Sequence, residues 1–122
     1  MPFSSSVRSD ILNFYFGAAP AITKPASLLL SLHSADPGLT GAGELSGGGY
    51  ARQAVTFGPE ADGVVKTVAE VEFSDLPAST IGWVGVWAAA GGFLFGASLG
   101  QAKTVGAGDF FRVPANGTIS LQ

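Results

Sequence analysis

The order of apolar and polar positions along the chain predicts one short helix near its start. Ser4 to Ser6 offer N-cap hydroxyls, and the apolar residues that follow recur at helical spacing: Val7, Ile11, Leu12 and Tyr15. Gly17 then supplies a stop signal. We therefore expect an amphipathic helix within residues 1–17.

After the helix, short apolar or alternating runs are separated by turn-forming residues, which is typical of β-strands. The run 26–33 is apolar and short enough for a buried, central strand. The segment 64–73 alternates, so that one face carries Val65, Thr67, Ala69, Val71 and Phe73 and the other carries Lys66, Glu70 and Glu72. Further strands are predicted at 50–57, 81–90, 93–100, 101–105, 110–114 and 118–122.

Seven or eight short strands at regular intervals predict a mainly β fold, an antiparallel β-sandwich or jelly roll with one short N-terminal helix. The composition is uniform, so we expect a single domain over 1–122, made of a helical arm (1–17) and a β-sandwich (26–122). Turn formers fill the segment 34–49, which predicts a flexible surface loop whose first turn is Asp36-Pro37-Gly38.

Charge is scarce in this chain and limits the classes of partner. Charged residues make up 12% of the sequence, against roughly 25% in an average soluble domain, so part of the surface is expected to meet protein. The net charge is −3 and no basic cluster is present, which argues against nucleic-acid binding. The chain has no cysteine, so disulfides and thiolate metal sites are excluded.

An uncharged stretch between Asp75 and Lys103 is long enough to span a bilayer, and its Gly92, Gly96 and Gly100 have the spacing of helix-dimer motifs. A β-hairpin explains the stretch better, because the pair Gly91-Gly92 separates two apolar runs. The N-terminus has no apolar signal segment, so we expect synthesis in the cytoplasm and no membrane partner.

The candidates for catalytic chemistry all have a simpler structural explanation. His33 is the single histidine, and its neighbours Ser34 and Asp36 are typical turn residues, so we expect no catalytic residue and no enzyme activity. Carboxylates are scattered among turns, which predicts no metal or cofactor site beyond the alternative of a weak calcium loop. Trp83 and Trp87 share one face of a strand, where core packing is favoured over sugar binding.

Several runs of residues resemble a widespread family of short phage structural proteins, described as tail-fibre-like or minor tail proteins. The resemblance rests on Phe16-Gly17, on LHSADPG at 32–38, on ELSGGGYARQAVTF at 44–57, and on the order of strands and turns from Ile81 to the C-terminus. One departure is VWAAAGG, where relatives more often carry Asp before the hairpin glycines.

The resemblance implies a virion component whose partners are other phage virion proteins, either the major capsid protein or tail proteins. We expect a capsid decoration (cement) protein, because the chain has no fibre-forming repeat and no heptads. The alternative is a tail or tail-fibre protein, which could contact a receptor. A symmetric site on a particle and a shortage of polar surface favour a homotrimer.

The candidate interface residues are aromatic and leucine side chains in the N-terminal segment and the loop: Phe3, Phe14, Tyr15, Phe16, Leu39 and Leu45. The first sixteen residues hold more aromatic area than one face of a short helix can bury, so some rings are expected to face a neighbouring subunit. The alternative is that these rings plug the open end of the sandwich.

Overall fold

The computed structural model of the chain describes residues 4–17, 27–59, 61, 64–89, 92–116 and 118–120. These residues form one helix and eight antiparallel strands, which confirms the predicted mainly β fold with a short N-terminal helix. The elements are α1 (Ser5–Phe16), β1 (Leu28–His33), β2 (Gln53–Val55), β3 (Val64–Lys66), β4 (Val71–Phe73), β5 (Ser79–Ala88), β6 (Phe93–Val105), β7 (Phe111–Val113) and β8 (Thr118–Ser120).

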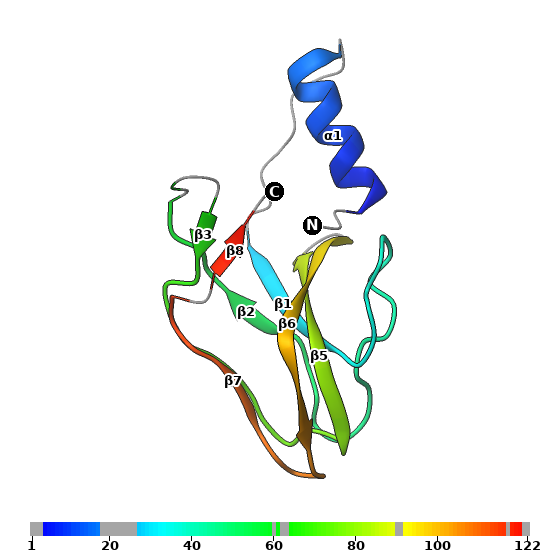
Figure 1. The fold of residues 1–122 in the computed structure, drawn as a ribbon, viewed down its shortest axis with the longest axis vertical. Helices are drawn as coiled ribbons and strands as arrows, with labels where there is room; N and C mark the ends of the chain where they lie inside the picture. Colours follow the sequence, from blue (N-terminus) through cyan, green and yellow to red (C-terminus); the bar gives the residue numbers. More distant parts are fainter. Residues whose placement is uncertain are drawn as a thin grey trace.

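A four-stranded sheet of order β2-β1-β5-β6 forms one layer of the fold, and the two-stranded ribbons β3–β8 and β4–β7 accompany it (Figure 1). Directly paired residues share a face, so the pairs Leu30–Val86 and Leu32–Val84 place apolar side chains on one side of this sheet. Val71 and Phe73 of β4 belong to the same hydrophobic core, while Glu72 between them is exposed. The arrangement fits a β-sandwich.

Two predicted strand boundaries are wrong, each for a reason visible in the pairing. The segment 64–73 is not one strand, because β3 pairs with β8 and β4 pairs with β7, and Ala69 in the connection is exposed. The segments 93–100 and 101–105, in contrast, form the single strand β6. Gly100, with φ of 84°, marks an irregularity in that strand and not a turn between two strands.

The glycine-rich segment 34–49 lies at the surface, with most of its residues exposed, but it also packs against the sheet. It turns back over the sheet, and Pro37, Gly41 and Leu45 are buried. The Leu45 amide donates to the Leu32 carbonyl (3.0 Å), and Glu44 forms a β-bridge with His33. The segment thus continues the edge of β1 beyond Leu30, where β2 stops pairing.

Glycines make this close contact possible. A Cβ on Gly41 would lie 2.7 Å from the Trp87 ring, and a Cβ on Gly96 would lie 2.8 Å from the Pro37 ring. The loop therefore lies so close to β5 and β6 that only glycine, which has no Cβ, fits at these two positions.

Trp83 and Trp87 lie on one face of β5, as predicted, but not in the hydrophobic core. Trp83 pairs with His33, and the Trp87 indole bonds to Ser31, so both rings are on the face opposite to Leu30 and Leu32. Both side chains are half-buried.

The uncharged stretch between Asp75 and Lys103 forms most of the β5–β6 hairpin, as the sequence predicts. No helix in the described part of the chain has the length and apolar character that a membrane crossing requires.

Substituting Gly96→Ala tests the contact between loop and sheet. The new methyl would overlap Pro37, so we expect the free energy of unfolding to fall by about 1 to 3 kcal/mol in denaturant titrations. Gly82→Ala in the neighbouring strand is the matched control, because its Cβ meets only the Ala102 methyl at 3.8 Å. That control should be neutral or gain up to about 1 kcal/mol. Equal stability of the two variants would contradict the close packing.

Candidate functional site: an exposed helix on a braced β domain

Helix α1 is fixed to the β domain at its N-cap residue, Ser4. The Ser4 hydroxyl accepts a hydrogen bond from the Val7 amide (3.2 Å), which confirms the predicted N-cap. The Ser4 amide donates to the Leu94 carbonyl of β6 (2.6 Å). From this point the helix projects beyond the end of the four-stranded sheet (Figure 1), and it ends at Gly17.

The second half of α1 presents large apolar side chains to solvent. Their exposed fractions are high: Leu12 58%, Phe14 53%, Tyr15 71% and Phe16 84%. Phe14 and Tyr15 meet edge to face with their ring centroids 5.0 Å apart, and Tyr15 and Phe16 are 6.3 Å apart. The rings thus contact each other and not the interior of the sandwich, which contradicts the plug alternative for these residues.

The remaining candidate interface residues divide between surface and core. Leu39 is exposed (42%) and stays a candidate. Leu45 is 8% exposed and packs in the core of this chain, so it presents little surface to a neighbouring subunit. Phe3 lies outside the described residues.

Leu39 lies at the same end of the molecule as the start of α1. Its neighbours along the loop, Pro37 and Gly41, pack against Gly96 and Phe93 at the beginning of β6. Ser4 is bonded to Leu94 in the same stretch of β6. The exposed apolar side chains of the helix and of the loop are therefore carried by one end of the sheet.

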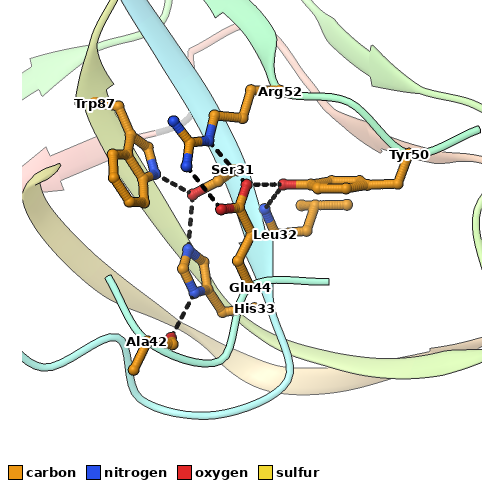
Figure 2. Close-up of polar contacts among 8 residues, drawn as sticks. All are labelled: Ser31, Leu32, His33, Ala42, Glu44, Tyr50, Arg52 and Trp87. Atoms are coloured by element: carbon orange, nitrogen blue, oxygen red, sulfur yellow. Dashed lines mark hydrogen bonds and ion pairs between the residues drawn. The ribbon is translucent and has the colours of Figure 1, made fainter. Parts of the chain in front are cut away.

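A carboxylate holds the loop to this end of the domain (Figure 2). Glu44 accepts two parallel hydrogen bonds from the Arg52 guanidinium, each 2.9 Å long, and a third from the Tyr50 hydroxyl (2.7 Å). The Tyr50 hydroxyl in turn accepts from the Leu32 amide of β1 (3.0 Å). The guanidinium lies over the Trp87 ring, 3.5 Å from its centroid.

A second chain of hydrogen bonds passes through His33. Its Nδ1 lies 2.8 Å from the Ala42 carbonyl, which can only accept, so Nδ1 carries the hydrogen. Nε2 of the neutral ring then accepts from the Ser31 hydroxyl (2.7 Å), and that hydroxyl accepts from the Trp87 indole N–H (2.8 Å). Figure 2 shows both chains reaching Trp87, whose indole bonds to Ser31 and lies beside the Arg52 guanidinium.

Burial shifts the protonation of this network. It lowers the pKa of His33 below its ordinary 6.5, against the raising effect of the bond to Ala42. Burial alone would raise the pKa of Glu44, but the hydrogen bonds from Arg52 and Tyr50 outweigh it and lower this pKa. The pKa of Tyr50 is raised, first by its burial. Neutral His33 and ionised Glu44 are therefore the forms that the fold stabilises.

The arrangement around His33 serves structure and offers no access to a substrate. Ser31 and His33 are both 0% exposed. Ser34 and Asp36 bond to nearby backbone, as predicted for turn residues: Ser34 to the Gly43 carbonyl (3.4 Å) and Asp36 to the Gly38 amide (2.9 Å). Within the described residues, no three metal-ligating side chains of His, Asp or Glu come together.

The lowered pKa of His33 predicts acid sensitivity. Below about pH 6.5 the unfolded chain takes up a proton at this residue and the folded chain does not, so the free energy of unfolding should fall between pH 7 and pH 5. One proton accounts for at most about 1.4 kcal/mol per pH unit. In denaturant titrations at several pH values, the free energy of unfolding should depend less on pH in His33→Gln than in the unsubstituted chain. An unchanged pH dependence would assign the acid sensitivity to another group. Protonation of Glu44 lowers the free energy of unfolding further below about pH 4.5.

The comparison with known proteins gives one family. A family model described as "Podophage GP4 fiber I protein gp80" matches residues 2–121. No curated protein matches the chain. The family description names a fiber protein, so it favours the tail-fibre alternative over the head-decoration protein expected from the sequence. The match covers nearly the whole chain, and the chain therefore belongs to this family of phage fibre structural proteins.

Proposed function

We propose that the chain is a non-enzymatic structural subunit of a phage tail fibre or its attachment point, and that α1 joins it to other virion proteins. The observation that carries the proposal is the projecting helix, whose Leu12, Phe14, Tyr15 and Phe16 are each more than half exposed. A monomer in water gains nothing from presenting these side chains together. Family membership supports the location on a fibre.

The β domain acts as the rigid body in this proposal. Loop 34–49 is bonded to β1 and to Arg52, and it packs against β5 and β6. In the described part of the chain, no buried side-chain nitrogen or oxygen lacks a hydrogen-bond partner. A load passed from α1 through Ser4 to β6 is thus passed on to the sheet and to the loop that is bonded to it.

The double substitution Phe14→Ser and Phe16→Ser tests the role of the helix. Both rings are exposed, so the free energy of unfolding should change by less than about 0.5 kcal/mol. Incorporation into particles should fall about tenfold or more, because each ring that is buried at a contact contributes 1 kcal/mol or more. Purified particles of a phage carrying the variant gene, probed by quantitative immunoblot, give the readout.

Phe110→Ser is the matched control for this experiment. Phe110 is 56% exposed, a fraction similar to the 53% of Phe14, but it precedes β7 and does not belong to the helix. Normal incorporation of the helix variant would contradict the proposal. Immunogold labelling of intact particles tests the location, where label on the tail is expected and label spread over the head would restore the decoration reading.

A further inference from the structure

We infer that the surface around Trp83 binds a neutral saccharide, with a pyranose ring stacked on the indole. The inference goes beyond the proposed function, because it concerns a ligand of the β domain and not the contact of α1 with other virion proteins. It follows from the unused groups of the Trp83 side chain, from the open space beside this residue, and from the hydroxyl groups on the same face of the sheet.

The two tryptophans of β5 differ in how far the fold uses their side chains. The Trp87 ring lies under the Arg52 guanidinium and meets the Phe93 ring edge to face, with 5.2 Å between centroids. Its indole N–H donates to Ser31. The Trp83 side chain, in contrast, forms no ring contact, cation–π contact or hydrogen bond in the described part of the chain. No described buried nitrogen lacks a partner, so the half-buried Trp83 has an indole N–H that reaches solvent.

The space beside Trp83 is open. The β5–β6 register shifts directly before this residue, where residues 99–102 of β6 lie opposite Gly82. A Cβ on Gly82 would meet only the Ala102 methyl at 3.8 Å, and a Cβ on Gly100 would meet nothing within 4 Å. Irregularities of this kind redirect side chains and are common next to binding sites. The surface next to the indole therefore has room for a ligand.

Hydroxyl groups lie on the same face of the sheet as Trp83. Ser98 is the direct pairing partner of Trp83 and is exposed. Ile81 points into the core with 0% exposure, so the preceding residue, Thr80, faces the opposite side, which is the side of Trp83. Thr80 pairs with Thr104, and their exposed hydroxyls are 3.2 Å apart. Each hydroxyl both donates and accepts, as the hydroxyls of a sugar do.

This chemistry fits a neutral sugar better than other ligands. A pyranose presents C–H groups that stack on an aromatic face, and hydroxyls that accept from an indole N–H. Lys103 is the one charged residue in the stretches 79–83 and 98–104, and its pairing with Ile81 places it on the other face. A nucleic acid or an anionic sugar would therefore find no cation beside Trp83. A protein interface would need more apolar area than one indole offers.

The position of this face agrees with a role in contacting glycans. The start of β5 and the end of β6, which carry Thr80 and Thr104, lie at the end of the molecule opposite to α1 (Figure 1). A subunit that is held through α1 therefore leaves this end accessible to a polysaccharide on the surface of a bacterium.

Fluorescence tests the site directly, because the chain has only these two tryptophans. In full-length Trp87→Phe, Trp83 is the sole indole, and neutral oligosaccharides of glucose, galactose, mannose or rhamnose should change its fluorescence in a saturable way. In full-length Trp83→Phe, the same titrations should leave the remaining fluorescence unchanged. Capsular polysaccharide and lipopolysaccharide O-chains from the infected bacterium, titrated separately, distinguish the two sources of such a sugar.

Calorimetry on full-length protein gives the affinities. We expect Trp83→Ala to weaken binding of the sugar about tenfold or more, because the stacking surface is lost. Thr104→Val should weaken binding about threefold through the loss of one hydrogen bond. Thr104 is exposed, so this variant keeps the fold and remains informative if Trp83→Ala is unstable. Sialyllactose, an anionic sugar, is the matched ligand control and should bind more weakly than lactose.

Three results would overturn the inference. They are the absence of binding of every neutral sugar at about 10 mM, equal affinities of the unsubstituted chain and both substituted chains, and tighter binding of sialyllactose than of lactose. The outcome is separable from that of the incorporation experiment. If no sugar binds and Phe14→Ser with Phe16→Ser still prevents incorporation, the structural role in the fibre stands without a glycan site.

Discussion

The hydrogen bonds accepted by the Glu44 carboxylate are the interactions on which the described architecture depends most. The carboxylate receives hydrogen bonds from Arg52 and Tyr50, and through Tyr50 it reaches the backbone of β1. The loop, the residue before β2 and the central strand β1 are therefore joined at one point. Removing one charged partner from such a half-buried pair leaves the other without compensation, which is costly in free energy.

Local patterns in the sequence predict the helix and the location of most strands, but not every strand boundary and not the long-range contacts. The N-cap of α1 and the central position of β1 follow from residue types within a few positions. The docking of segment 34–49 does not, because turn formers specify local dihedral angles and say nothing of what the turn packs against. The pairing of Glu44 with Arg52 had one signal, two opposite charges flanking a glycine-rich run, but its geometry depends on the fold.

The candidate interface shows the same division between local and global information. Aromatic density near the N-terminus predicted an exposed surface, and Phe14, Tyr15 and Phe16 are exposed. Leu45 is buried, because the loop turns back and carries this side chain into the core. The choice between head and tail could not come from the fold, since one sandwich architecture serves many roles. It required the family match.

Strand β6 is a sheet edge that is protected against pairing with other strands. It is the last strand in its sheet, and in the described part of the chain Ser4 bonds to its backbone at Leu94. A flat edge of this length invites sheet-to-sheet pairing, which has no natural end and leads to fibrils. The irregularity at Gly100 and the charge of Lys103 make this edge a poor template. Growth by strand addition at this edge is thereby discouraged.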